Sequence, residues 1–357
     1  MTQHILFFVH GMGEHDDTWH EKGLGVLKSA FNDYELTRDV DFDSRFRVVP
    51  IVYNDIFKET RERANADFAA FKTAVLGSID VSDAASQQAV STELDKYVDL
   101  IGAGGDNFIW THILDVILYR FSNTIRMGID VSVAEQILDA ISSHQHITWS
   151  VIAHSLGTSV SHNTLNSLYN TGFPNATNGP IGKLDPLESR CNTLAMIANV
   201  SRVLQRTDAK VYESRVKPGS ATAGRLCSYY LNARHKLDPF TVPKAFEPDI
   251  WPDPATFSTE RYQHLRPSHI SFEFDELSRV HDLDHYLENP RVHVPLIRSI
   301  LGRRVIGAEE YRSAKSRFDS EVRSNSTDRA RSLLESKLPS PSGNWRNLLA
   351  VIKRLLS

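Results

Sequence analysis

The chain has few cysteines, no long hydrophobic run and no large excess of charge of one sign. Its 357 residues include two cysteines, Cys191 and Cys227, which are too few for a disulfide framework and fit a reducing compartment or simple core packing. No stretch approaches the roughly 20 consecutive apolar residues that a membrane-spanning helix needs. The net charge of −4 gives no reason to expect nucleic acid or an acidic surface as a partner.

An apolar run does lie close to the N-terminus, at residues 5–9. No basic region precedes it, it is too short for the core of a signal peptide, and His10 and Gly11 end it at once. We interpret it as a buried strand. Without a secretory signal or a spanning helix, the protein is expected to be soluble and cytoplasmic.

Short apolar runs alternate with helical patterns along the chain. Runs rich in β-branched residues on both faces are typical of parallel strands covered by helices on both sides. Four runs fit this description, the last less strongly: residues 4–9, 46–53, 147–153 and 226–232. Helical patterns occupy residues 111–121, 132–141 and 158–169. This alternation predicts an α/β fold with a mostly parallel sheet and helices on both faces.

The predicted sheet domain covers residues 1–301 and carries a large insertion at residues 55–110. The insertion begins with a charged helical segment and is interpreted as a helical cap or lid, although a helical excursion with no role at a site is an equal alternative. Its phenylalanines fit either a substrate pocket or helix packing: Phe57, Phe68 and Phe71. Six prolines at 238–268 exclude long regular elements there. Residues 302–357 are predicted to form a helical tail.

One stretch, VIAHSLGTSV at residues 151–160, places a serine at a sharp turn between a strand and a helix. Small residues are needed two positions before and after such a serine, because strand and helix pass close together there. Ala153 and Gly157 meet this need, and His154 and Leu156 flank Ser155. The pattern predicts a nucleophile elbow, in which the serine oxygen projects above the sheet.

A serine is a poor nucleophile at neutral pH and needs a base and a group that orients the base. Asp238, in a turn after the run at 226–232, is the candidate carboxylate, with Asp249 and Asp253 the next candidates. The base is expected between a possible strand at 270–274 and a helix that starts near Asn289 and Pro290. That loop holds His281 and His285, and we favour His281 because it is nearer the strand end.

The glycine-rich turn after the first strand is the candidate oxyanion loop. Its sequence, His10-Gly11-Met12-Gly13, lets the backbone approach a substrate, and the amide of Met12 is the expected donor. The second donor is expected to be the amide of Leu156. His10 is expected to brace the loop. A phosphate-binding loop is the weaker alternative, because no third glycine or Lys-Ser/Thr pair follows.

These motifs together resemble those of the α/β-hydrolase superfamily, and within it the lipase-like serine esterases. Members have an oxyanion loop of the form His-Gly-x-Gly, found here at 10–13, and an elbow that can read Ala-His-Ser-x-Gly, found here at 153–157. The stretch Asn-x-x-His-x-x-Asp-Pro at 232–239 is similar to the acid-bearing segment of some intracellular phospholipase-like members. The elbow departs from the usual Gly-x-Ser-x-Gly in having Ala153.

The resemblance covers most of residues 1–301 and leaves the tail unexplained. It implies an eight-stranded type of sheet, a triad of Ser155, Asp238 and His281, and no cofactor. It also implies cleavage of a carboxylic ester, from a small molecule or a lipid, through an acyl-enzyme.

Two other functions remain open. A non-catalytic hydrolase-like module would bind a ligand through the same pocket. A metal-dependent hydrolase is the weaker alternative, because histidine and carboxylate mixtures can bind zinc or manganese but neither group here has a motif with defined geometry. Those groups are His10, Glu14, His15, Asp16 and Asp17 early in the chain, and His281, Asp282, Asp284 and His285 late in it.

Overall fold

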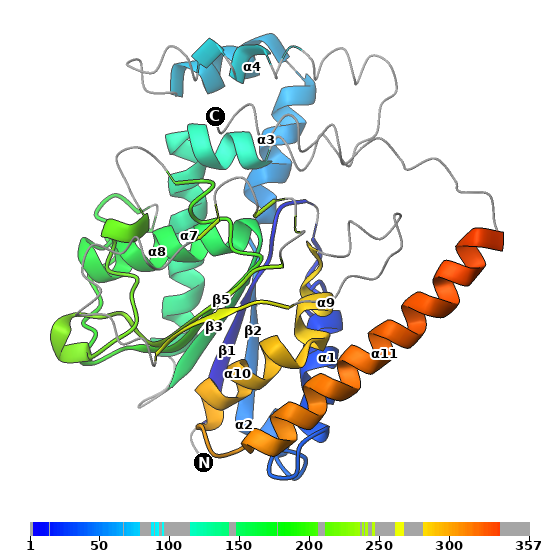
Figure 1. Ribbon diagram of the computed structural model, residues 1–357. Helices are drawn as coiled ribbons and strands as arrows, with labels where there is room; N and C mark the ends of the chain where they lie inside the picture. The colour runs from blue at the N-terminus through cyan, green and yellow to red at the C-terminus, as the bar shows by residue number, and fades with distance from the viewer. Residues whose placement is uncertain are drawn as a thin grey trace.

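A computed structural model of the chain contains one sheet with helices packed against both of its faces (Figure 1). The structure describes residues 3–13, 15–66, 68–78, 87–88, 90–92, 95, 115–142, 148–176, 178–205, 211–235, 238, 240–241, 245–246, 261–267 and 281–335. The helices are α1 (Glu21–Asn32), α2 (Phe42–Arg45), α3 (Asn54–Ala66), α4 (Phe68–Ser78), α7 (Asn123–Ser142), α8 (Leu156–Asn170), α9 (Leu283–Glu288), α10 (Pro290–Leu301) and α11 (Ala308–Glu335), with the short 3-10 helices η1 (Val211–Glu213) and η2 (Ala221–Ala223).

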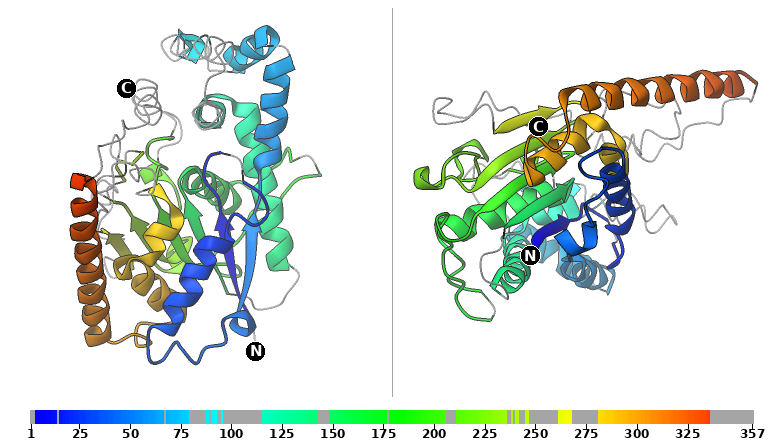
Figure 2. Two further views of the ribbon diagram at one scale, coloured as in Figure 1. Left: turned by 90° about the vertical axis from the view of Figure 1, so that its right-hand side faces the viewer. Right: turned by 90° about the horizontal axis from the view of Figure 1, so that it is seen from below.

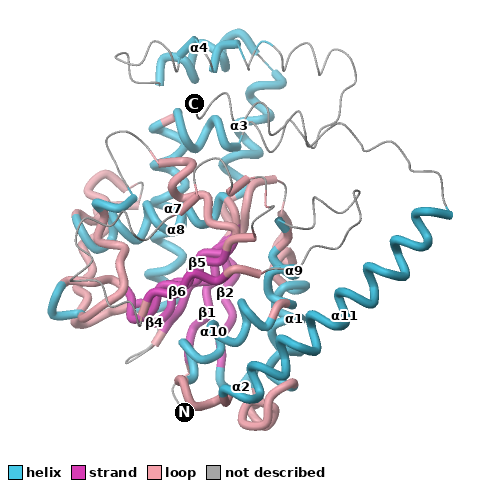
Figure 3. Tube along the Cα trace, in the orientation of Figure 1, coloured by secondary structure: helices cyan, strands magenta, loops and turns pink. Residues whose placement is uncertain are grey.

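Six parallel strands form the sheet, in the order β2-β1-β3-β4-β5-β6 (Figure 3). They are β1 (His4–Val9), β2 (Phe46–Ile51), β3 (Trp149–His154), β4 (Cys191–Ile197), β5 (Cys227–Ala233) and β6 (Tyr262–Leu265). The predictions of a parallel α/β sheet and of four strands are confirmed. β4 and β6 were not predicted, and the possible strand at 270–274 lies outside the described residues. The resemblance implied eight strands, and the part of the chain described here contains six.

The central strands are buried on both faces because their side chains alternate between two hydrophobic cores. In β1, Ile5, Phe7 and Val9 pack into one core, while Leu6 and Phe8 pack into the other. The first core is covered by α7 and α8, and the second by α1, α9 and α10, on opposite sides of the sheet (Figure 1). This two-sided burial explains why β1 reads as a continuous apolar run.

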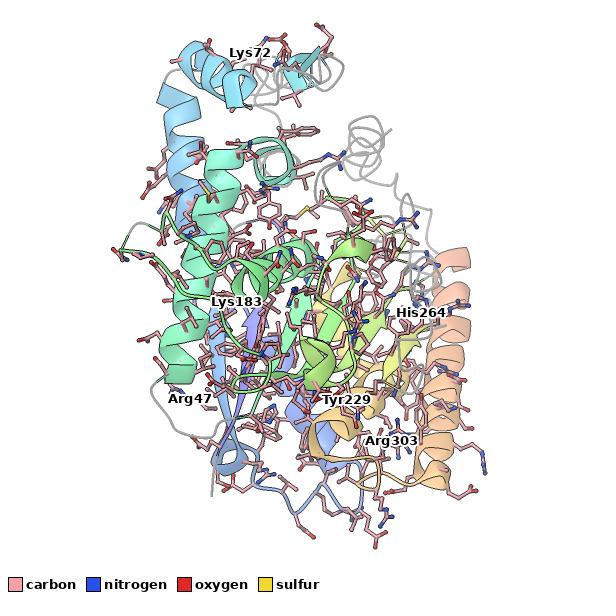
Figure 4. The ribbon with its side chains drawn as sticks, turned by 90° about the vertical axis from the view of Figure 1, so that its left-hand side faces the viewer. Arg47, Lys72, Lys183, Tyr229, His264 and Arg303 are labelled. Atoms are coloured by element: carbon pink, nitrogen blue, oxygen red, sulfur yellow. The ribbon has the colours of Figure 1, made fainter. Side chains whose placement is uncertain are left out.

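Helices α3 and α4 follow β2 and lie above the sheet, within the insertion predicted at 55–110 (Figure 1). Figure 4 places Lys72 of α4 at one end of the molecule and Arg303 at the other. Phe57 of α3 is buried against the Tyr53 ring, so it packs in the core. The side chains of Phe68 and Phe71 lie outside the described residues, as do residues 96–114.

The tail begins with α11, which packs along the outside of α10 and then extends away from the body (Figure 2). Arg291 of α10 donates two hydrogen bonds to the Asp319 carboxylate of α11, at 2.8 and 2.9 Å. Asn289 caps α10 by accepting from the Arg291 amide, as its position before Pro290 predicted. Among the helices described, none is long and apolar enough to cross a membrane.

His285 was expected in a loop, and this was wrong. It lies in α9, a short helix whose Leu283, Tyr286 and Leu287 are buried in the core beside α1. Burial at positions i, i+3 and i+4 is what a helix provides. The apolar spacing within 283–287 therefore decided the local structure.

Candidate active site

The candidate residues meet at the carboxyl end of the sheet, where the chain order changes direction. From β1 the chain passes to β2 on one side, and β3 then pairs with β1 on the other. Such a switch point leaves a crevice at the carboxyl ends of the two strands, where open parallel sheets bind ligands. The loop at 10–13 follows β1 and Ser155 follows β3, so both lie at this switch point.

Ser155 occupies a strained turn between β3 and α8. Its φ of 53° and ψ of −125° lie in a region that non-glycine residues rarely adopt, at a cost of about 1–3 kcal/mol. The turn is held by a hydrogen bond from the Ser155 amide to the Ile197 carbonyl of β4, and by two from Thr158 to the Ser155 carbonyl. The surrounding structure therefore stabilises a conformation in which the buried Ser155 hydroxyl lies within hydrogen-bond distance of His281.

Ser155, His281 and Asp238 form one continuous chain of hydrogen bonds. The distance from His281 Nε2 to Ser155 Oγ is 2.7 Å, and His281 Nδ1 lies 3.0 and 2.9 Å from the two carboxylate oxygens of Asp238. An ionised carboxylate only accepts, so Nδ1 carries a proton and Nε2 accepts from the serine hydroxyl. Of the two histidines considered, His281 is the one that the structure brings to Ser155. Asp249 and Asp253 lie outside the described residues.

Asp238 is fully buried and has several hydrogen-bond donors around it. The Tyr286 hydroxyl donates to Oδ2 at 2.8 Å and the Phe240 amide to Oδ1 at 3.0 Å. Burial raises the pKa of Asp238, but the attraction of His281, followed by the hydrogen bonds from His281, Tyr286 and Phe240, outweighs burial and lowers the pKa below its usual value. The carboxylate is therefore negatively charged at neutral pH.

His154 and Phe240 hold the His281 ring in place. The Nε2 of His154 donates to the backbone carbonyl of His281 at 2.5 Å, and the Phe240 ring lies 4.4 Å from the imidazole. Burial, and then the charge of His281, lower the pKa of His154 to about 3, so it stays neutral at ordinary pH. His154 therefore supports the base by hydrogen bonding without carrying charge.

Two glycines allow the strand, the loop and the helix to approach one another. A Cβ at Gly157 would lie 2.2 Å from the His10 carbonyl oxygen and 2.6 Å from that of Val9. A Cβ at Gly11 would lie 2.8 Å from Ser155 Cβ. Only a residue without a side chain fits at either point. The loop at 10–13 is consequently in direct contact with the serine.

His10 orients the peptide group between Gly11 and Met12. Its Nδ1 donates to the Gly11 carbonyl at 2.8 Å, while its Nε2 accepts from the Tyr53 amide at 3.4 Å. The imidazole stacks on the Tyr53 ring at 3.9 Å, and burial followed by the nearby His15 lowers its pKa well below 6.5. Because a trans peptide holds C=O and N–H on opposite sides, fixing the Gly11 carbonyl also fixes the direction of the Met12 N–H.

The amides of Met12 and Leu156 are the expected pair of anion donors. No hydrogen bond from either amide is made to the residues that the structure describes. Leu156 is the first residue of α8, where the helix dipole favours negative charge. Met12 is buried, with a side chain 7% exposed, in the same core as Leu156. A pair of amides that converge beside a serine nucleophile can stabilise a tetrahedral oxyanion, and this is the role expected of Met12 and Leu156.

Several supporting residues were missed by sequence reasoning. Tyr286 binds the carboxylate, Tyr53 donates to the His10 carbonyl, and Thr158 accepts from the Val200 amide. Asp115 accepts from the Gly13 amide at 3.0 Å. None of these lies in a recognisable motif, and the partners of the two tyrosines and Asp115 lie more than 40 residues away. Only the position of Tyr286 next to the candidate histidines gave a signal.

The two histidine and carboxylate groups considered as metal sites do not form ligand sets. Among the described residues, no three His, Cys, Asp or Glu side chains are grouped so that they could hold a metal ion. Glu14 lies outside the described residues. Comparison with protein-family models, curated proteins and solved structures found no match. The interpretation of this site therefore rests on its geometry.

Proposed function

We propose that the protein is a serine hydrolase of the α/β-hydrolase type that cleaves a carboxylic ester. The observation that carries the proposal is the chain of hydrogen bonds from Ser155 Oγ through His281 to Asp238, built on a strained turn at the switch point of the sheet. The strand order and the glycine loop after β1 support the same conclusion.

In the first half of the reaction, Ser155 Oγ attacks the ester carbonyl carbon as its proton moves to His281 Nε2. The carbonyl electron pair becomes an oxyanion, which the amides of Met12 and Leu156 stabilise. His281 then gives its proton to the departing alkoxide, the carbon–oxygen bond breaks, and an alcohol leaves. The acyl group remains on Ser155.

In the second half, water loses a proton to His281 Nε2 and attacks the acyl carbon. The Ser155 oxygen leaves and takes that proton back, which releases the carboxylic acid and restores the site. Asp238 stays ionised throughout. Its charge stabilises the imidazolium that forms twice in each cycle and keeps the ring in the productive tautomer.

The substrate is a small-molecule or lipid ester whose acyl chain lies beneath the insertion at 55–110. Apolar residues of that insertion are buried in the same hydrophobic core as Met12 and Leu156: Phe57, Val75 and Val90. An acyl chain is itself apolar, so apolar surroundings of this kind suit it. No cofactor is needed for the chemistry described.

Labelling with a fluorophosphonate probe and turnover of p-nitrophenyl esters of increasing chain length test the proposal together. Ser155→Ala should abolish labelling and lower kcat by on the order of 10⁴–10⁶-fold, because the nucleophile is lost. His281→Ala should abolish activity, whereas His285→Ala, which changes a histidine outside the hydrogen-bonded chain, should be milder. Asp238→Asn should cost about 10⁴-fold in kcat.

A folded wild-type protein that neither labels at Ser155 nor cleaves any ester would refute the enzyme and favour a non-catalytic binding module. Activity that a chelator abolishes and that survives in Ser155→Ala would indicate a metal-dependent hydrolase instead. Hydrolysis of peptides or phosphodiesters alone would leave the site catalytic but contradict the ester substrate.

A further inference from the structure

A buried ion pair connects the insertion to the candidate oxyanion loop. Arg61 of α3 donates to Asp115 Oδ1 at 2.7 Å, and the Gly13 amide donates to Asp115 Oδ2 at 3.0 Å. Asp115 lies in the helical segment 115–121, just beyond the predicted insertion, and Arg61 lies near the start of the insertion, 54 residues earlier. The Asp115 carboxylate thus joins α3 and the segment after the insertion to the loop after β1.

The burial of this pair sets it apart from ordinary surface ion pairs. The Asp115 side chain is fully buried and that of Arg61 is 8% exposed. Removing two charges from water is costly, and apolar side chains of similar volume often stabilise a fold at least as well as a buried pair. Stability alone therefore does not account for the ion pair. The hydrogen bond from the Gly13 amide indicates that the pair orients the loop after β1.

That hydrogen bond completes the restraint of Met12. The carbonyl of the Met12–Gly13 peptide accepts from His15 Nε2 at 3.1 Å, and the amide of the same peptide donates to Asp115. The preceding peptide is held through its Gly11 carbonyl by His10. With both peptide planes fixed, neither backbone angle of Met12 is free, and its N–H keeps one direction. Removing Asp115 would leave the Met12–Gly13 peptide held by His15 alone.

We propose that Asp115 and Arg61 are positioning residues for the oxyanion hole, which makes the insertion part of the catalytic apparatus. The proposal rests on the ester hydrolase function proposed above. Asp115 holds the Met12–Gly13 peptide, and Arg61 holds Asp115 in the required orientation. Neither side chain touches the substrate. The insertion thereby controls the rate of the chemical step and has a role beyond covering the site.

The test compares Asp115→Ala, Asp115→Asn and the neutral pair Arg61→Gln/Asp115→Asn in the full chain. Asp115→Ala should lower kcat by about ten- to a hundredfold with KM changed by less than about threefold, a part of the 10²–10³-fold loss seen when an oxyanion donor is removed. In the neutral pair the asparagine oxygen accepts from the Gly13 amide, and the glutamine oxygen accepts from the asparagine NH2, so the pair should recover most of kcat.

The matched control is Asp95→Asn, which removes the same charge from another ion pair of the insertion. Lys72 Nζ lies 2.5 Å from Asp95 Oδ1, but the Asp95 side chain is 61% exposed and does not contact the loop. This variant should keep wild-type kcat and KM. Figure 4 shows Lys72 on α4, away from the sheet.

Binding of a trifluoromethyl ketone separates positioning from a merely structural role, because its adduct with Ser155 carries an oxyanion. In the Asp115 variants its affinity should fall by the same factor as kcat/KM, while the affinity of the unreactive methyl ketone stays constant. A structural role would lower the fraction of titratable serine and leave the affinity of the remainder unchanged. That result, or wild-type kcat in folded Asp115→Asn and Asp115→Ala, would overturn the proposal. A wild-type enzyme without ester hydrolysis would instead refute the function on which it rests.

Discussion

The donors around the buried Asp238 orient its carboxylate and, together with the attraction of His281, keep it charged. Asp238 has no access to water, so its carboxylate depends on the donors that surround it. Tyr286 is the most informative of these, because its hydroxyl donates to Asp238 and accepts from the His235 amide at 2.9 Å. It thus connects the acid to the backbone that follows β5. A hydroxyl with two fixed partners orients the carboxylate as well as stabilising its charge.

We expect Tyr286→Phe to lower kcat about tenfold, equivalent to about 1.4 kcal/mol, with little change in KM. The substitution keeps the ring in its buried position but removes a hydrogen bond to a charged group, which contributes about 1.5–3 kcal/mol. Steady-state kinetics measure the effect, and unfolding in denaturant measures the accompanying loss of stability. A variant with unchanged kcat would show that the remaining donors suffice to hold Asp238.

Among the elements, those with a distinct periodicity could be predicted and those without it could not. β1 is an uninterrupted apolar run, and α10 has a capping asparagine followed by proline. β4 was missed because CNTLAMI begins with polar residues, of which Thr193 is buried and bonds to Ser299. β6 has four residues, two of them polar, and owes its position to pairing with β5. The four residues of β6 do not by themselves indicate that they pair with β5.

In the candidate site too, some features could be predicted from the sequence and others could not. The elbow and the glycine loop each follow a strand and occupy a few consecutive residues, so their motifs are local and could be read directly. The contact of Asp238 with Tyr286 joins residues 48 positions apart, and that of Asp115 with Gly13 joins residues 102 apart. Such contacts depend on how the helices pack on the sheet, which a single sequence does not state.

The close approach of β1 and α8 gives a prediction at the scale of elements. Gly157→Ala should destabilise the protein by several kcal/mol and reduce activity, because its Cβ would collide with backbone carbonyls that cannot move independently of β1. The matched control is Gly25→Ala in α1, where a Cβ meets nothing within 4 Å. That change should stabilise the fold by about 0.5–1 kcal/mol. Urea unfolding of both variants measures the contrast, and equal stabilities would contradict the close approach.

At the scale of the whole molecule, buried histidines and a buried aspartate change the stability of the fold with pH in opposite directions. Burial lowers the pKa of His162 to about 3, and its Nδ1 has no hydrogen-bond partner among the described residues. His4, His154 and His293 are also buried with lowered pKa values. Burial raises the pKa of Asp130 to about 7, and the hydrogen bond from Tyr119 only partly offsets this. Stability therefore depends on pH through protons that the folded and unfolded chains bind differently.

The signs of these two effects are opposite. A histidine that titrates near 3 in the folded protein and near 6.5 in the unfolded chain contributes stability that is complete above pH 6.5 and is lost as the pH falls toward 3. Asp130, at about 7 when folded and 3.8 otherwise, contributes stability that is complete below 3.8 and is lost as the pH rises through 7. Between about pH 4 and 6.5 each group changes the slope of stability against pH by about 1.4 kcal/mol per unit.

His162→Gln and Asp130→Asn should therefore change the slope in opposite directions. Wild-type stability should fall as the pH is lowered from 6.5 to 4, because several buried histidines outweigh one aspartate. His162→Gln should make this fall shallower by about 1.4 kcal/mol per pH unit, and Asp130→Asn should make it steeper by the same amount. Urea unfolding at half-unit pH intervals measures both slopes, whatever the stability of each variant at pH 7. A His162→Gln slope equal to that of the wild type would mean that this histidine takes up its proton without unfolding, and that the interior between α7 and α8 admits charge.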